Sequence, residues 1–360
     1  MNCCVRCFAD PEIIGIIKSQ KTKGNCDFCG HNGDYVYSLD TETTLSDMFG
    51  ELLDIYTVAS SLPNTFPKEN TDLLKNILHN RWPIFNVEPD CIYKLITNIC
   101  HEKYVDQPEL FDNPVGILES QDKDYLDSFS IIRNHHWNDF VEAIKWENRF
   151  RADYINKDVL GLFIRSVRKP YKAGKTFYRA RVCSSEAGFS KSMMGAPPAN
   201  LAKAGRVNPE GISVLYLADS VKTTLHEIRA GIFDYVTVGN FKLKEDIEII
   251  DFANLDNVSP FYAHNQTGIE YTQHAINIEH LKLISSEIAK PLRRQDSALD
   301  YLPTQYISDY IKSRRFDGVE YVSTMCKEGF NLAVFDETLF KCTKTTVYDI
   351  KSLAYTYDSI

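Results

Sequence analysis

The sequence predicts a multidomain protein with three parts: a small cysteine-rich N-terminal module, an α-helical domain and a C-terminal α+β domain. Three observations lead to this organisation. Five of the ten cysteines lie within the first 29 residues, apolar residues recur at helical spacing through the middle, and strand-like runs alternate with helical ones afterwards. We place the three domains at residues 1–40, 41–160 and 165–360. With 360 residues and 44% apolar composition, the chain is long enough for two or three domains.

The N-terminal cysteines form two Cys-x-x-Cys pairs, and 18 residues separate the pairs. This spacing is typical of a structural zinc site with four thiolate ligands. The expected ligands are Cys4, Cys7, Cys26 and Cys29. Cys3 lies one residue out of register and is an alternative to Cys4, while His31 is a weaker substitute. A catalytic zinc or a redox dithiol is the other interpretation, which we disfavour because four thiolates leave no open coordination position.

The middle part predicts an α-helical domain. From residue 41 onward, apolar residues such as Leu45, Phe49 and Leu52 recur three or four positions apart, which is typical of an amphipathic helix. Further helices are expected at residues 72–80, 88–103 and 124–151, with prolines in the stretches between them.

The C-terminal part predicts a sheet with associated helices, an α+β arrangement. Its expected strands are residues 176–182, 214–218, 234–243, 247–250, 318–322, 330–335 and 345–350. Its expected helices are residues 221–231, 269–289 and 304–314. Neither a Gly-x-Gly-x-x-Gly motif opening a helix nor a phosphate-loop motif occurs, so the usual nucleotide-binding folds are not supported.

The net charge of −9 is unevenly distributed. Residues 41–160 carry 11 basic and 21 acidic side chains, whereas residues 161–360 carry 25 basic and 23 acidic ones. An acidic total disfavours a nucleic-acid partner, although two or three local cations suffice to hold a pyrophosphate. No apolar run approaches the ~20 residues of a membrane helix, and the N-terminus lacks the apolar core of a signal peptide. We therefore expect a cytoplasmic protein without a membrane partner.

Residues 204–229 concentrate turn-forming and charged side chains around one short strand. A turn at Asn208–Gly211 leads into the strand, and Asp219 and Ser220 are placed to cap the helix that follows. Arg206 and Glu227 therefore flank a compact strand–turn–helix unit.

This unit resembles the RES domain, a family named for an arginine, a glutamate and a serine and built around the destruction of NAD. Three further segments match the family in the correct order: Phe-Tyr-Arg-Ala-Arg at 177–181, Tyr-Leu-Pro-Thr-Gln at 301–305, and Phe-Asp-Gly-Val-Glu-Tyr-Val-Ser at 316–323 followed by Gly-Phe-Asn-Leu-Ala-Val-Phe at 329–335. The resemblance covers roughly residues 165–360. It implies a fold similar to the diphtheria-type ADP-ribosyltransferases, which hold NAD in a cleft between two small sheets.

The resemblance also implies the site residues. Arg179, Glu227 and Ser323 are the family's namesakes, and Arg206 and Tyr216 are expected pocket neighbours. Cleaving the nicotinamide–ribose bond develops positive charge on the ribose carbon, which one carboxylate can stabilise by roughly 3–4 kcal/mol. Glu227 is the candidate for this role; the alternative is a surface glutamate paired with Arg229 or Lys222.

The arginines suit a pyrophosphate, because a guanidinium binds phosphate oxygens bidentately and stays charged. Arg179 and Arg206 are expected to bind it. Arg181 lies two residues from Arg179 and either shares the pocket or forms an ion pair with the scaffold. Tyr216 either stacks on a ring of NAD or belongs to the core. Ser323 has no Ser-His-Asp context, so we assign it to positioning.

The helical domain resembles the HEPN-like region found ahead of some RES domains. Nuclease members of that group have a histidine four to six residues after an arginine, whereas His135 and His136 follow Arg133 too closely. A ribonuclease role is therefore doubtful.

These observations predict an NAD-degrading enzyme, a glycohydrolase or a phosphorylase, acting as a toxin or a defence effector. The acceptor stays open: water, inorganic phosphate or a macromolecule. The alternatives are an ADP-ribosyltransferase and a non-enzymatic protein that binds a nucleotide. Expected partners are an antitoxin, a regulatory protein or a second copy bound through the helical domain.

Overall fold

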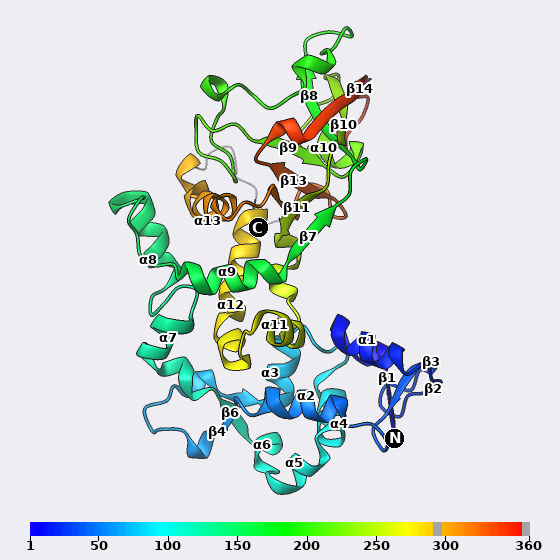
Figure 1. Cartoon of the computed structure of the whole chain (residues 1–360), viewed down its shortest axis with the longest axis vertical. Coiled ribbons are helices and arrows are strands. Elements are labelled where there is room, and N and C mark those ends of the chain that lie inside the picture. The colour runs from blue at the N-terminus through cyan, green and yellow to red at the C-terminus, as the bar shows by residue number, and fades with distance from the viewer. Residues whose placement is uncertain (291–296, 355–360) are drawn as a thin grey trace. The chain divides into compact units, whose positions relative to one another are not determined.

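The computed structural model describes residues 1–290 and 297–354, which divide into two compact units. The N-terminal unit comprises Met1–His136, Asp153–Ser166 and Asp256–Leu281. The C-terminal unit comprises Trp137–Ala152, Val167–Leu255 and the described residues from Lys282 onward. Figure 1 shows a helical N-terminal unit and a C-terminal unit built around a sheet.

The N-terminal unit begins with a three-stranded sheet in the order β1-β3-β2. Its strands are β1 (Asn2–Cys4), β2 (Lys23–Asn25) and β3 (Asn32–Ser38), and helix α1 (Pro11–Ser19) follows β1. Asp10 caps this helix, because its carboxylate accepts hydrogen bonds from the backbone N–H groups of Glu12 and Ile13. Pro11 occupies the first helical position, where no N–H is needed.

Helices make up most of the remaining N-terminal unit. They are α2 (Thr44–Leu53), α3 (Leu74–Asn80), α4 (Pro89–Ile99), α5 (His101–Asp106), α6 (Glu109–Asp112), α7 (Lys123–Phe129), α9 (Lys157–Ser166), α11 (Pro260–Thr267) and the first part of α12 (Tyr271–Ala289). A small sheet of β4 (Thr57–Val58), β6 (Pro114–Gly116) and β5 (Asp72–Leu73) accompanies them, which the expectation of a purely helical segment had missed.

Two predicted helices are wrong in extent. The helix expected at 88–103 is interrupted at Cys100, whose φ of −103° and ψ of 46° are not helical. The helix expected at 124–151 ends at Phe129, and α8 (Trp137–Glu142) and a π-helical turn (Ala143–Glu147) follow a break. Within this break Arg133 has a φ of +55°, and the Ser130 hydroxyl accepts a hydrogen bond from Ile132 N–H. Side-chain bonds of this kind compete with helix formation.

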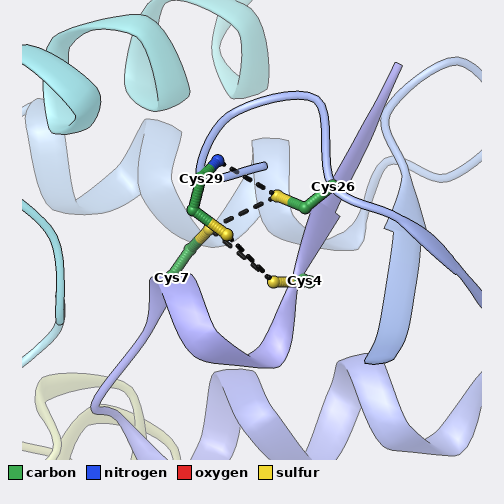
Figure 2. Close-up of side chains that lie close together, drawn as sticks. All are labelled: Cys4, Cys7, Cys26 and Cys29. Atoms are coloured by element: carbon green, nitrogen blue, oxygen red, sulfur yellow. Dashed lines mark hydrogen bonds between the residues drawn. The ribbon is translucent and has the colours of Figure 1, made fainter. Parts of the chain in front are cut away.

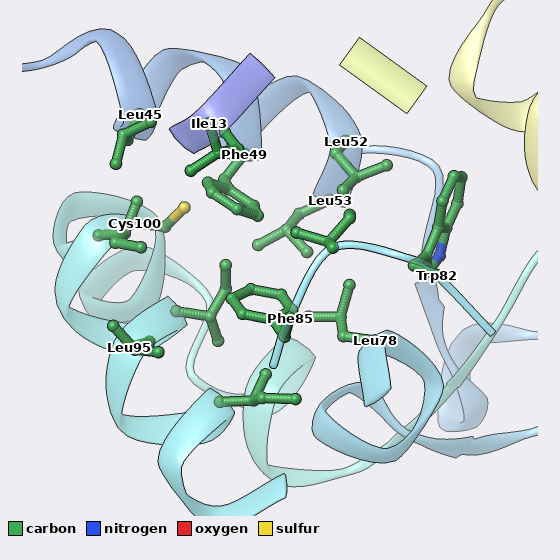
Figure 3. Close-up of a cluster of buried hydrophobic side chains, with 14 of the residues drawn as sticks. Ile13, Leu45, Phe49, Leu52, Leu53, Leu78, Trp82, Phe85, Leu95 and Cys100 are labelled. Carbon is green, nitrogen blue, oxygen red and sulfur yellow. The ribbon is translucent and has the colours of Figure 1, made fainter. Parts of the chain in front are cut away.

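Aromatic rings hold the core of the N-terminal unit together (Figure 3). Phe49 of α2 stacks on Phe85 at 5.6 Å and meets Phe261 of α11 edge-on at 5.3 Å. Leu45, Leu52 and Leu53 share this buried face of α2, as the apolar spacing predicts. Burying each such side chain contributes about 1.5–3 kcal/mol.

The C-terminal unit contains an eight-stranded mixed sheet in the order β14-β10-β8-β9-β13-β12-β11-β7. Its strands are β7 (Arg168–Tyr171), β8 (Thr176–Cys183), β9 (Leu215–Ala218), β10 (Tyr235–Leu243), β11 (Ile247–Asp251), β12 (Gly318–Val322), β13 (Phe330–Val334) and β14 (Phe340–Asp349). Strands β11 and β12 pair in parallel and the other neighbours pair antiparallel. All the predicted strands are present; β7 was not predicted, and β14 starts five residues earlier than expected.

Two helices of this unit, α10 (Val221–Glu227) and α13 (Leu302–Ser313), follow the prediction closely. Helix α10 ends four residues before its expected end, because Arg229 adopts a left-handed φ of +51°. Val221, Leu225 and Ile228 pack against Ala180 and Val238 of the sheet. Among the described residues, no helix is long and apolar enough to cross a membrane.

Candidate functional site

The end of helix α10 positions the carboxylate of Glu227. The Ser220 hydroxyl caps the start of this helix by accepting from Thr223 N–H, as the sequence predicted for the cap. Glu227 is the last residue of the helix. Its Oε1 accepts hydrogen bonds from the Ser323 hydroxyl at 2.5 Å and from the Asn331 amide at 2.9 Å. The structure therefore brings Glu227 and Ser323 together, although 96 residues separate them.

Ser323 itself sits in a tight turn between β12 and β13. Its hydroxyl accepts from Cys326 N–H at 3.1 Å, and its own N–H donates to the Gly329 carbonyl at 2.9 Å. A Cβ on Gly329 would overlap the Thr223 hydroxyl and lie 2.8 Å from Thr223 Cγ2. Glycine is therefore required where this turn meets the first turn of α10.

Arg206 lies beside the other oxygen of the carboxylate, with 4.0 Å between its guanidinium and Glu227 Oε2. Its Nε donates to the Lys290 carbonyl at 3.2 Å, and the guanidinium lies 5.5 Å from the centre of the Tyr321 ring. Burial opposes the charge of this group, but Tyr321 and Glu227 together raise the pKa of Arg206 above its ordinary value. The guanidinium is thus charged and held in place at neutral pH.

A dense hydrogen-bond network fixes the loop that carries Arg206. The buried Asn208 amide donates to three carbonyls, those of Lys203, Pro209 and Ile212, and its Oδ1 accepts from the Tyr216 hydroxyl at 2.7 Å. On α13, the Gln305 amide donates to the carbonyls of Gly205 and Asn208, and the Thr304 hydroxyl donates to the Arg206 carbonyl at 2.7 Å. A loop with satisfied polar groups is a rigid support for a charged side chain.

Arg179 reaches the same region from strand β8. One terminal nitrogen of its guanidinium donates to the Tyr216 carbonyl at 3.2 Å. Its buried Nε has no hydrogen-bond acceptor among the described residues. Burial, and next the nearby charge of Arg181, lower the pKa of Arg179 to about 10, which still leaves it charged at neutral pH. A buried cation with a spare donor is suited to an anionic ligand.

These residues line one cavity of ≈ 250 Å³. Its polar lining residues are Arg179, Arg206, Tyr216, Thr224, Glu227, Tyr301, Tyr321 and Asn331. Sequence reasoning missed Tyr301, Tyr321 and Asn331, even though all three lie inside or beside segments that carry the family motifs. This volume is below the roughly 300–1,000 Å³ typical of small-molecule pockets, so the cavity has room for one end of a dinucleotide and not for all of it.

Arg181 does not line this cavity. Its guanidinium donates to the Met193 carbonyl and lies 4.3 Å from the centre of the Phe189 ring. The two arginines lie on the same face of β8, as expected, but only Arg179 reaches the cavity. Tyr216 lines the cavity, yet its hydroxyl is engaged by Asn208 and Val207 N–H, so its position is fixed by the scaffold.

The four predicted metal ligands also lie together (Figure 2). The sulfurs of Cys4, Cys7, Cys26 and Cys29 all lie within 4.8 Å of one another. The closest pairs are Cys4 with Cys29 at 3.5 Å, Cys7 with Cys26 at 3.6 Å and Cys4 with Cys7 at 4.0 Å. Four sulfurs at ~2.3 Å from a tetrahedral zinc are separated by ~3.8 Å, so this cluster can bind a metal ion of that size.

The neighbouring cysteines take no part in the cluster. Cys3 alternates with Cys4 along β1 and is buried in the hydrophobic core, so Cys4 is the residue that the structure places among the candidate ligands. The Cys29 backbone N–H lies 3.5 Å from Cys26 Sγ, an orientation that supports a thiolate.

Comparison with known proteins covers the C-terminal part of the chain. The family model described as the RES domain matches residues 176–358, which is half of the chain. A solved structure of the M. tuberculosis MbcT–MbcA toxin–antitoxin complex is similar at 14% identity and a TM-score of 0.30, over 52% of this chain and 92% of that chain. No curated protein matches. Because the match to the family model spans the strands and helices that build the cavity, we conclude that this chain belongs to the RES domain family.

Proposed function

We propose that this protein degrades NAD by cleaving the bond between nicotinamide and ribose, with the cavity around Glu227 as the active site. One observation carries the proposal: two neutral donors, Ser323 and Asn331, hold one oxygen of Glu227. Neutral donors fix the direction of a carboxylate without cancelling its charge, so the charge remains for a developing cation.

The reaction needs a negative group beside the ribose carbon. As the glycosidic bond breaks, its electron pair leaves with nicotinamide, and the ribose carbon becomes an oxocarbenium ion. Glu227 stabilises this cation, and the hydroxyl of Ser323 keeps the carboxylate in position. Water then adds to the carbon and loses a proton, which gives ADP-ribose; with inorganic phosphate as acceptor, the product is ADP-ribose 1″-phosphate.

The two arginines account for the affinity of the site for a dinucleotide. In this proposal Arg179 and Arg206 bind the pyrophosphate, because each is charged and partly buried at the cavity. A guanidinium near a phosphate contributes to binding in the ground state and the transition state alike. Glu227 and the arginines thus have separate roles, the carboxylate in chemistry and the arginines in binding.

The cysteine cluster is, in our proposal, a structural zinc site. Its four sulfurs complete a tetrahedron and leave no open position for substrate. Residues 1–40 pack into the core of the N-terminal unit through side chains such as Ile13 and Tyr37, and a metal would add to their stability by tying the two Cys-x-x-Cys pairs together. The toxin role and an antitoxin or regulatory partner follow from the family resemblance and belong to the same proposal.

The purified full chain tests the activity directly. We expect nicotinamide to accumulate from NAD without any reduced NAD, as measured by chromatography and by absorbance. Running the reaction with and without phosphate, and identifying the sugar product by mass spectrometry, distinguishes the two acceptors. Glu245→Gln, a change at an exposed glutamate of the same unit, is the matched control. If the wild-type protein leaves NAD intact, or transfers hydride from a co-substrate to it, the proposal is wrong.

The zinc proposal has its own measurement. We expect about one zinc ion per chain by elemental analysis. Cys7→Ser and Cys29→Ser should lose the metal and destabilise the N-terminal unit first, whereas Cys183→Ser, a matched control in the C-terminal unit, should keep it. A metal-free preparation with unchanged thermal unfolding would contradict a structural role for zinc.

A further inference from the structure

The N-terminal unit contains a second polar cavity, of ≈ 250 Å³, that the proposed activity does not use. Basic side chains reach it from three separate segments: Arg81 directly after α3, the loop from Arg133 to His136, and His280 of α12. Burial lowers the pKa of His280 below its ordinary value, so the positive charge of the cavity comes from Arg81 and Arg133, which lie far apart in the sequence. Their convergence indicates a site for an anion.

The loop at Arg133 is held in a strained conformation. Arg133 has a φ of +55°, a region that residues other than glycine seldom adopt. Neighbouring bonds hold the strain: Ile131 N–H donates to the Asn277 side chain at 2.6 Å, and Asn156 N–H donates to the Ile131 carbonyl at 2.8 Å. Strained residues that the surrounding structure holds in place occur preferentially at binding sites.

The charges in this cavity are incompletely neutralised. The Arg133 guanidinium meets Asp127 at 3.5 Å and Asp153 at 3.4 Å, long contacts for charged partners, and its buried Nε has no acceptor among the described residues. For Arg81, no ion pair occurs within residues 1–290 and 297–354. The two arginines therefore have binding capacity for the oxygens of an anion, and phosphate matches the geometry of a guanidinium.

A larger cavity of ≈ 400 Å³ adjoins the first, because Arg81, Ser120 and Ile276 line both. Its other lining residues include the carboxylates of Glu69, Asp72 and Glu279. Carboxylates accept hydrogen bonds from hydroxyl groups and repel phosphate. The smaller of these adjoining cavities is thus lined by basic side chains, and the larger one by carboxylates. This arrangement suits a molecule with a phosphate at one end and hydroxyl groups at the other.

We propose that these joined cavities bind a small phosphorylated molecule of the nucleotide or sugar-phosphate class, with its phosphate between Arg81 and Arg133. The site lies in the N-terminal unit and is independent of the cavity around Glu227. The N-terminal unit would therefore bind a ligand different from the one bound in the cavity around Glu227.

Calorimetric titration of the full chain tests this proposal, with AMP and inorganic phosphate as probes. The parent protein carries Arg179→Ala, which weakens nucleotide binding in the cavity around Glu227. We expect AMP to bind this parent, and Arg81→Gln to weaken binding by about tenfold, the effect of losing one charge-assisted hydrogen bond. Arg165→Gln, at an exposed arginine of α9 in the same unit, is the matched control and should bind AMP as the parent does.

Comparing AMP with inorganic phosphate shows whether the bound phosphate group belongs to an organic molecule or is free phosphate. Tighter binding of AMP than of phosphate supports an organic ligand that extends into the acidic cavity; equal affinities support free phosphate as the ligand. Arg133→Lys keeps the charge but not the fork, and we expect it to weaken AMP binding while the thermal unfolding of the protein stays unchanged. The proposal is overturned if neither probe binds at millimolar concentration, if Arg81→Gln binds AMP as tightly as the parent, or if single-stranded RNA binds more tightly than AMP through Arg81.

Discussion

Two glutamates of the C-terminal unit have opposite surroundings. Glu227 lies in the cavity, where its closest partners are the neutral side chains of Ser323 and Asn331. Glu320 on β12 is only 2% exposed and contacts the Lys169 ammonium and the Tyr171 hydroxyl, each at 2.5 Å. Burial raises the pKa of Glu320 above its ordinary value, although Lys169 and Tyr171 act in the opposite direction.

These different surroundings indicate different roles: Glu320 contributes to stability, and Glu227 to the proposed reaction. A carboxylate whose charge is neutralised by a close ammonium has little left to offer a substrate, and removing Glu320 leaves Lys169 with only its longer contact to Asp251, at 3.3 Å. Glu227 has no cation at hydrogen-bond distance: its closest donors are neutral, and the Arg206 guanidinium lies 4.0 Å from its other oxygen. Glu227 has the features of a reacting group, and Glu320 those of a structural one.

The strongest test of the comparison is Glu227→Gln. This change keeps the shape of the side chain and removes its charge, so we expect turnover to fall at least ~100-fold, or roughly 3 kcal/mol in the transition state. NAD binding should be largely kept. Single-turnover kinetics together with a separate measurement of NAD affinity decide the matter. Near-normal turnover would show that Glu227 is not the catalytic carboxylate.

Glu320→Gln should have the converse result. Loss of the closer of the two carboxylate partners of Lys169 is expected to lower the free energy of unfolding by about 2 kcal/mol, with turnover at low temperature nearly unchanged. Chemical denaturation and NAD turnover on the same preparation measure both quantities. A variant that unfolds like the wild type but fails to cleave NAD would place Glu320 in the reaction and remove the contrast.

Arg179→Ala should weaken NAD binding and leave the chemical step unchanged. We expect NAD affinity to fall about tenfold, because a charge-assisted bond to phosphate is lost in ground and transition states alike. Arg179→Lys should restore part of the affinity, since it restores the charge. The assignment fails if affinity is unchanged while turnover at saturating NAD falls.

The smallest expected effect comes from Asn331→Ala. Glu227 keeps its bond to Ser323, so we expect only about a fivefold loss of turnover, equivalent to ~1 kcal/mol, with the KM for NAD unchanged. Steady-state kinetics test this split. A larger loss than that of Glu227→Gln would mean that Asn331 contacts the substrate itself.

The sequence predicts the C-terminal sheet better than the middle of the chain. Strands such as β9, β11, β12 and β13 are short apolar runs between turns, and their pattern does not depend on distant contacts. The break after Phe129 is different. It depends on the Ser130 hydroxyl and on Asn277, which lies 146 residues away from Ile131, and a periodicity argument cannot include such a partner.

The site follows the same pattern. Residues within the family motifs, such as Glu227 and Ser323, could be named before their contact was known. Arg181 has the same chemistry and strand face as Arg179, but Met193 and Phe189 bind it outside the cavity. The sequence motifs gave Asn331 no role, and the structure brings its amide to Glu227. Spacing predicts the cysteine cluster because its ligands come in two local pairs.

The lack of a side chain at Gly329 allows the loop that carries Ser323 to pack closely against helix α10, which carries Glu227. The turn that carries Ser323 touches the helix that carries Glu227 at this position, with no room for one methyl group. The alignment of serine and glutamate is therefore sensitive to a backbone shift of a fraction of an ångström at a residue that meets no substrate. A side chain at position 329 would push the loop that carries Ser323 away from α10. The position of Ser323 relative to Glu227 would then change.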